Sequence, residues 1–259
     1  MTLSQGGTDN DMVVSLKDNF HRMQWAEQLV ILSEMAGGLA HEIRNPLAGI
    51  KAATEVLSTD TSVAPEHRDV LTKVVEQIRK IEVILKGFLN FAKPPKPQFV
   101  PVDLNNVVDA TVGLAVRHPA FSSRNGNSIT IVKDYDAHLP NIIADPIQLQ
   151  QVFMNLLINS AEAMHAEGTI TIHSSLAEDK RFVSIKMVDT GHGIDDQTFD
   201  KIFQPFFTTK TQGTGLGLAI TKGLIEQHGG QIRVVNNHDR GVSFTILIPI
   251  QHGEEVKDI

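Results

Sequence analysis

The sequence predicts two domains of different fold class: an all-α helical hairpin that pairs into a dimeric four-helix bundle, followed by an α+β two-layer sandwich. Three observations in the 259-residue chain indicate this. Apolar residues recur at steps of three and four as far as Phe88, three prolines stand within 94–97, and alternating strand patterns follow them. We therefore expect a lead-in over 1–22, a hairpin over 23–92, a proline-rich linker over 93–101, a second domain over 102–252 and a tail over 253–259.

Composition argues against several classes of function. The formal net charge of −7 argues against a nucleic-acid partner, because such a partner requires a basic surface. The chain has no cysteine, so it can form neither a disulfide framework nor a thiolate site. It contains no apolar run near the roughly 20 residues of a membrane helix, and its first residues lack a signal-peptide pattern. We expect a cytoplasmic chain without membrane contact.

The first helix of the hairpin carries the segment from His41 to Pro46. Its apolar stripe is formed by Leu29, Leu32, Ala36, Leu39, Ile43, Ile50 and Leu57. His41 lies about 170° from the centre of that stripe, so its ring is expected to face water beside Arg44 and Asn45. Pro46 predicts a bend one turn beyond the histidine. A lone exposed histidine is usually a solvated surface residue, so the helix pattern alone leaves that alternative open.

A second amphipathic helix follows a short polar turn. Pro65 suits its first turn, and its apolar positions are again three and four apart: Leu71, Val74, Ile78, Ile81, Leu85 and Phe88. Two such helices leave apolar stripes that one hairpin cannot cover. We therefore predict a homodimer.

The second domain mixes helix and strand patterns. Helices are expected over about 104–116, 146–164 and 216–227, and strands over 129–132, 169–173, 183–188, 231–235 and 243–248. Adjacent strands joined by short turns favour a mostly antiparallel sheet.

Three stretches of this domain carry candidate ligand chemistry. Asn155 and Asn159 lie four apart on one helix flank, where an amide oxygen suits Mg²⁺, although such residues are more often surface or capping groups. The glycines of Val188–Ile194 let a planar ligand approach the backbone, and Asp189 can accept a hydrogen bond from an exocyclic amine. Gly213–Leu218 opens a helix, so its amides can face phosphate, yet it matches neither the P-loop nor the dinucleotide-binding pattern. Phe203–Lys210, between the two glycine clusters, is long enough to form a lid.

In this order, the chain resembles the sensor histidine kinases of two-component signalling. Leu39–Leu47 is similar to the family's H box, Asn155–Met164 to the N box, Asp189–Gly193 to the G1 box, Phe203–Phe207 to the F box and Gly213–Leu218 to the G2 box. The resemblance runs from about Glu27 to Pro249 and is greatest to the nitrogen-regulation (NtrB-like) group. It implies a Bergerat-type (GHKL) ATP-binding fold, as in HSP90, MutL and gyrase.

The resemblance also implies roles for individual residues. His41 would be the phosphoacceptor through one ring nitrogen, and Glu42 would accept a hydrogen bond from the other ring nitrogen of His41. Asn45 would orient a water that hydrolyses the aspartyl phosphate of the response regulator. ATP would be held by Asn155, Asn159, Asp189, Gly191, Gly193, Phe203, Lys210, Gly213, Thr214, Gly215, Leu216 and Gly217, with Mg²⁺ on Asn159. Glu162 stands where many relatives carry a base, so Lys210 would substitute in contacting the triphosphate. The expected partner is a response-regulator receiver domain of the NtrC type, and the chain would be cytoplasmic or the cytoplasmic part of a longer sensor.

Two alternatives share parts of this pattern. A GHKL ATPase acting as a conformational clamp or chaperone would share the nucleotide boxes but would not need a His-Glu pair on an exposed helix face. A module that has lost ATP hydrolysis would need a damaged N or G box, and none is seen. Among the other histidines, His192 is expected to face solvent, and His228 to end a helix where the helix dipole favours it.

Overall fold

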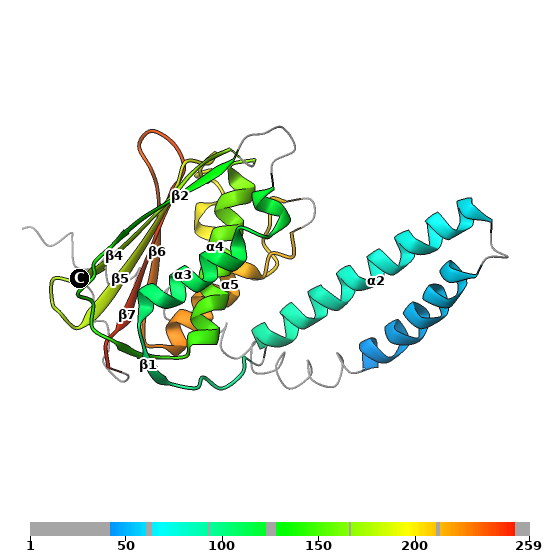
Figure 1. Cartoon of the computed structure of the whole chain (residues 1–259), viewed down its shortest axis with the longest axis horizontal. Coiled ribbons are helices and arrows are strands. Elements are labelled where there is room, and N and C mark those ends of the chain that lie inside the picture. Colours follow the sequence, from blue (N-terminus) through cyan, green and yellow to red (C-terminus); the bar gives the residue numbers. More distant parts are fainter. Residues whose placement is uncertain are drawn as a thin grey trace, which may run out of the picture. The chain divides into compact units, whose positions relative to one another are not determined.

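The computed structural model describes residues 42–60, 64–92, 94–122, 128–165, 167–210 and 213–251. The chain divides into two compact units, Met1–Pro94 and Pro95–Ile259. We describe each unit by itself (Figure 1).

Unit 1 contains the predicted helical hairpin. Residues 42–59 are helical, and α2 (Pro65–Ala92) is the second helix. Pro46 lies inside the first of these helices, which is helical on both sides of it. His41 and the helix expected before it lie outside the described residues.

The hairpin buries only part of its apolar surface. Val75, Ile78 and Leu85 of α2 are buried, together with Thr54 of the first helix. Two ion pairs also join the helices, Lys51 to Glu82 at 3.0 Å and Arg79 to Glu55 at 3.7 Å. Other residues of the predicted stripes stay exposed in the single chain: Ile43, Ile50, Leu57, Val74 and Ile81. The stripes are therefore split between the hairpin seam and an uncovered face.

Unit 2 is a two-layer α+β sandwich, as predicted. Its five-stranded sheet has the order β2 (Ile129–Tyr135), β4 (Gly168–Leu176), β5 (Phe182–Asp189), β7 (Val242–Pro249) and β6 (Gln231–Asn236). Only β2 and β4 pair in parallel, so the mostly antiparallel sheet is confirmed. Three helices cover one face of this sheet (Figure 1): α3 (Leu104–Ala115), α4 (Pro146–Ala163) and α5 (Gly217–Gln227).

Four short elements were not predicted. They are β1 (Val100–Val102), its antiparallel partner β3 (Ile142–Ala144), and the 3-10 turns η1 (Pro119–Phe121) and η2 (Phe199–Lys201). Each has three residues, too few for a periodic pattern to show.

The alternation of side chains along β5 sets the face of the sheet from which Asp189 projects. Val183, Ile185 and Met187 are buried at alternating positions of β5, and Asp189 continues the series. Because side chains two apart share a face of a strand, Asp189 enters the apolar layer between the sheet and the helices. The last residue of β5 is thus a carboxylate placed among core side chains.

The start of α4 binds the first residues of unit 2, which are part of the expected linker. Asp145 caps the helix, its Oδ1 accepting from Ile147 N at 2.9 Å and Gln148 N at 3.1 Å. Its Oδ2 accepts from Gln98 N at 2.7 Å, and Gln148 Nε2 donates to Pro95 O at 2.9 Å. The stretch 95–99 of the expected linker is therefore bound to unit 2.

His228 lies at the C-terminal end of α5, as predicted, but it is buried. Its Nε2 accepts from Asp145 N at 3.0 Å, and its Nδ1 lies 2.8 Å from Leu224 O. A backbone N–H is always a donor, so Nε2 is unprotonated and Nδ1 carries the proton. The Nδ1–H group therefore donates to a carbonyl in the last turn of α5, as suits a histidine at a helix C-terminus.

Among the described residues, no helix combines the length and the hydropathy needed to cross a bilayer.

Candidate functional site

The carboxylate of Asp189 is buried in the candidate site, with 3% of the residue exposed. Its Oδ1 accepts from Gly191 N at 2.9 Å and Val242 N at 3.2 Å. Its Oδ2 accepts from Ser160 Oγ at 2.9 Å. A carboxylate oxygen can accept two hydrogen bonds, so Oδ2 has capacity for one more donor, such as an amine.

Residues 189–194, here called the G1 loop, follow β5 and need their glycines. A Cβ on Gly191 would lie 2.9 Å from the Ala163 Cβ, and Gly193 has φ +80°. The cavity beside the loop has a volume of about 540 Å³ and is lined by His192, Gly193, Ile194, Asp195, Asp196 and Gln197. His192 is exposed, as predicted.

Asn155 and Asn159 lie on one flank of α4, as predicted, and reach different partners. Asn155 Nδ2 donates to Gly217 O at 3.2 Å and to Thr221 Oγ1 at 3.4 Å, which ties α4 to the start of α5. Asn159 Oδ1 accepts from Lys210 Nζ at 2.7 Å. The amide oxygen expected to bind Mg²⁺ therefore already faces a cation.

Lys210 is also paired with Glu162, one turn beyond Asn159 on α4. Both side chains of this pair are 40% exposed. Lys210 was expected to replace the basic residue that many relatives carry at position 162. It lies beside the glutamate that occupies that position here. Its ammonium group has two acceptors, an amide oxygen and a carboxylate.

The glycine-rich stretch before α5 packs closely against the lid. Gly215 has φ +67°, and a Cβ there would lie 2.4 Å from backbone carbon of Phe206. A Cβ on Gly213 would lie 2.4 Å from Thr208 Oγ1, which in turn accepts from Lys210 N at 3.0 Å. A side chain at either glycine would push this part of the lid away.

The start of α5 presents backbone donors. Leu216 occupies the cap position and makes no capping hydrogen bond with its side chain, while its N–H lies 3.4 Å from Thr214 Oγ1. The first amides of a helix lack partners within the helix and suit an anion. Phe203 is half-buried, and Lys222 Nζ lies 5.8 Å from its ring centroid.

The C-terminal half of α4 brings these predicted segments together. Asn155 contacts Gly217 of the G2 box, Asn159 contacts Lys210 of the lid, and Ser160 contacts Asp189. Ser160 is not among the site residues predicted from the sequence, where its hydroxyl among apolar positions was the available indication. Sequence reasoning also missed Asn236 and Asn237, which bond the two ends of the G1 loop.

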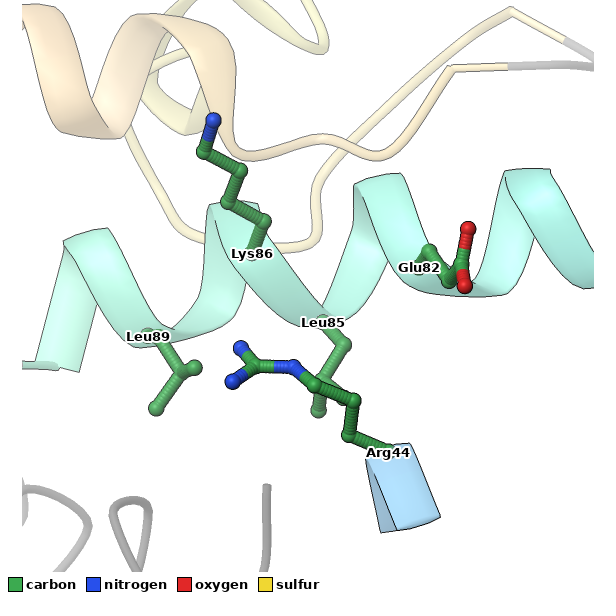
Figure 2. Close-up of a pocket in the computed structure, with 5 residues that line it drawn as sticks. All are labelled: Arg44, Glu82, Leu85, Lys86 and Leu89. Carbon is green, nitrogen blue, oxygen red and sulfur yellow. The ribbon is translucent and has the colours of Figure 1, made fainter. Parts of the chain in front are cut away.

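Two candidate residues of unit 1, Glu42 and Asn45, lie on the helix over 42–59. Glu42 and Asn45 are exposed there, whereas His41 lies outside the described residues. Arg44 reaches across Leu85 and Leu89 of α2 in a groove of about 380 Å³ that Glu82 and Lys86 also line (Figure 2). Arg44 therefore contributes to the groove between the two helices.

Comparison with known families accounts for both units. Residues 31–96 match the His Kinase A (phospho-acceptor) domain, and residues 144–252 match the histidine kinase-, DNA gyrase B- and HSP90-like ATPase. The chain belongs to the two-component sensor histidine kinases. Unit 2 carries the ATP-binding domain of this family, and His41 lies within the segment matched by the phosphoacceptor model.

Individual histidine kinases are similar over most of the chain. The histidine kinase AtoS of Escherichia coli (strain K12) is 38% identical over 234 residues, which are 90% of this chain and 37% of AtoS. ZraS of the same strain is 35% identical over 230 residues, 88% of this chain and 48% of ZraS. The chain thus spans less than half the length of these curated relatives.

Two solved histidine kinases are similar to the chain in fold. ShkA in complex with AMPPNP has a TM-score of 0.70 and 27% identity, covering 83% of this chain and 45% of ShkA. ThkA in complex with the response regulator TrrA has a TM-score of 0.59 and 28% identity, covering 91% of this chain and 67% of that chain.

Proposed function

We propose that this chain phosphorylates its own His41 with the γ-phosphoryl group of ATP and passes that group to an aspartate of a response regulator. The observation that carries the proposal is the convergence on α4 of Asp189, Lys210 and Gly217, from the three segments expected to bind nucleotide. The match of residues 31–96 to the phosphoacceptor model supports the role of His41 and disfavours a clamp without phosphotransfer.

The nucleotide fits the groups of unit 2 by type. Asp189 Oδ2 would accept from the adenine amine, with Gly191 and Gly193 leaving room for the base. Gly213, Thr214, Gly215, Leu216 and Gly217 would present backbone donors to the phosphates, and Phe203 and Asn155 would support the lid and the glycine-rich stretch. Lys210 would turn from Asn159 to a phosphate oxygen, as a cation that neutralises the triphosphate.

Mg²⁺ fits Asn159 because Oδ1 of this residue is a neutral oxygen that already points at a positive charge, the ammonium group of Lys210. A bound Mg²⁺ would neutralise charge on the phosphates and fix their orientation. Asn159 would hold it through Oδ1, and the remaining ligands would come from phosphate and water.

The transfer step requires little more than positioning. One ring nitrogen of His41 forms a bond to the γ-phosphorus while the bond from that phosphorus to the bridging oxygen breaks, and ADP leaves. Glu42 accepts a hydrogen bond from the other ring nitrogen and stabilises its proton. Since His41 and the nucleotide residues belong to different units, unit 2 must deliver its nucleotide to unit 1.

We place the chain in the cytoplasm, where ATP is available, as a homodimer whose partner is a receiver domain. ThkA was solved with a response regulator, which supports that class of partner. The similarity to the nitrogen-regulation group favours a regulator of the NtrC type. Asn45, exposed near the start of the described helix, would orient the water that hydrolyses the regulator's aspartyl phosphate.

The deciding experiment compares the native chain with His41→Gln in γ-labelled ATP and Mg²⁺. Native protein should acquire an acid-labile label, and the variant should acquire none, because glutamine offers no nucleophilic ring nitrogen. Label that persists in the variant would overturn the assignment of His41.

A matched variant, Asn45→Ala, should keep autophosphorylation and slow the loss of label from a phosphorylated receiver domain. Unchanged loss would contradict the role of Asn45 alone.

A further inference from the structure

The G1 loop is held at both ends by the chain that leaves β6. Asn236 is the last residue of β6, and Asn237 follows it. They lie more than 40 residues from the loop in sequence, so these contacts exist only in the folded unit.

Asn236 satisfies both backbone polar groups of Ile194, at the far end of the loop. Its Oδ1 accepts from Ile194 N at 2.9 Å, and its Nδ2 donates to Ile194 O at 2.7 Å. One side-chain amide thus pairs with one residue as a neighbouring strand would. The same Oδ1 would lie 3.4 Å from a Cβ on Gly193, so it also faces the glycine that turns the loop.

The near end of the loop is fixed by Asn237 and Gly241. Asn237 Nδ2 donates to Asp189 O at 3.3 Å and to Arg240 O at 3.3 Å, and its Oδ1 accepts from Ser243 Oγ at 2.6 Å. Gly241, with φ +84°, lies so close to Asp189 O that a Cβ would be 1.9 Å away. The side chain of Asn237 therefore stabilises the turn after β6 as well as the G1 loop, whereas the side chain of Asn236 bonds to Ile194 of the loop.

We propose that Asn236 is a positioning residue for nucleotide binding, which holds the G1 loop in the conformation that receives adenine. The inference rests on the proposed function, since it assumes that Asp189 and the loop glycines contact the base. Asn236 touches none of the groups that would react. By ordering the loop in advance, it removes part of the entropy loss that binding would otherwise carry.

The test measures ADP affinity, with Mg²⁺, by calorimetry on the full 259-residue chain. Asn236→Ala should weaken binding roughly three- to tenfold, the range set by one to two lost hydrogen bonds. Asn236→Asp keeps the acceptor for Ile194 N but sets an oxygen against Ile194 O, so its binding should be at least as weak. Asn141→Ala, at an exposed asparagine before β3, is the matched control and should bind as native.

Kinetics separate positioning from a general structural role. Autophosphorylation by Asn236→Ala should show a raised KM for ATP with kcat retained at saturation, because the phosphate groups and His41 are unchanged. A fall in kcat with an unchanged KM, or native ADP affinity in Asn236→Ala, would overturn the proposal. Failure of the native chain to bind any adenine nucleotide would instead overturn the proposed function.

Discussion

Lys210 and Glu162 form a contact that the family resemblance did not imply. Many relatives carry a base at the position of Glu162, and here a carboxylate stands beside the place expected for phosphate. The structure pairs that carboxylate with the lid lysine and places the same ammonium on Asn159. In the proposed function, Lys210 would have to leave Asn159 Oδ1 before Mg²⁺ could bind there.

This competition gives a prediction for Glu162→Gln. Removing the charge releases Lys210 and removes repulsion of the triphosphate, so binding of ATP with Mg²⁺ should tighten roughly two- to fivefold, as a half-exposed ion pair allows. Titration of native and variant chains measures this, and the difference should shrink at high salt because the charges are partly exposed. Glu178→Gln, at an exposed turn, is the control. Weaker binding in Glu162→Gln would show that Glu162 supports the nucleotide instead.

Tyr135 offers a pH-dependent test of the packing between β2 and α3. Burial raises the pKa of Tyr135 well above its ordinary value, aided by the hydrogen bond and negative charge of Asp109. Its hydroxyl donates to Asp109 Oδ1 at 3.0 Å. Because the folded pKa is the higher one, the stabilisation is complete below the unfolded pKa of about 10 and is lost as pH rises through the folded value.

Tyr135 is the only tyrosine of the chain, so phenolate absorbance reports it directly. The folded chain should ionise at clearly higher pH than the chain in denaturant. Asp109→Asn should lower that pH while leaving part of the shift, since burial remains. Equal titration of folded and unfolded chains would contradict the hydrogen bond between Tyr135 and Asp109.

At the scale of elements, the sequence predicted the helices and strands whose apolar residues recur periodically. It missed the short strands and the side-chain roles that depend on individual tertiary contacts. The helix α4 was predicted with its buried face because Leu149, Val152, Phe153 and Leu156 recur at helical spacing. The three-residue strands β1 and β3 carry no such period. The role of Asn236 required knowing that β6 ends beside the G1 loop, which is a tertiary fact. Two asparagines after a strand otherwise predict only a turn.

The cap of α4 predicts how firmly residues 95–99 are attached. Asp145→Ala removes the helix cap and the bond to Gln98 N, and should lower the free energy of unfolding of unit 2 by about 2 kcal/mol. Asp103→Ala removes the cap of α3 and an exposed hydrogen bond from Asn106 Nδ2, and should lower the free energy of unfolding by about 1 kcal/mol. Denaturant titration measures both.

Hydrogen exchange distinguishes the two caps. The Gln98 amide should exchange faster in Asp145→Ala and at the native rate in Asp103→Ala. Continued protection of Gln98 in Asp145→Ala would mean that other contacts hold the segment. With residues 95–99 attached, the proposed delivery of nucleotide to His41 would need a hinge in the chain before Pro95.

At the scale of the whole molecule, the two units differ in how completely they bury their apolar residues. Ile172, Ile185 and Ile246 in the sheet of unit 2 are fully buried. In unit 1, Ile50 is 52% exposed and Ile81 is 43% exposed. Regularly spaced apolar residues that stay exposed mark a surface for association, and a second identical hairpin offers the matching stripe.

The four-helix bundle is tested by placing a charge in this surface. Ile50→Lys should convert the dimer to a monomer at micromolar concentration, because an unpaired ammonium would have to be buried between the hairpins. Sedimentation equilibrium of the full chain measures the change. Ile147→Lys is the control, since that isoleucine is 74% exposed on unit 2, and its chain should remain dimeric. If Ile50→Lys also remains dimeric, the uncovered face of the hairpin is not the interface, and the association must be assigned to another surface.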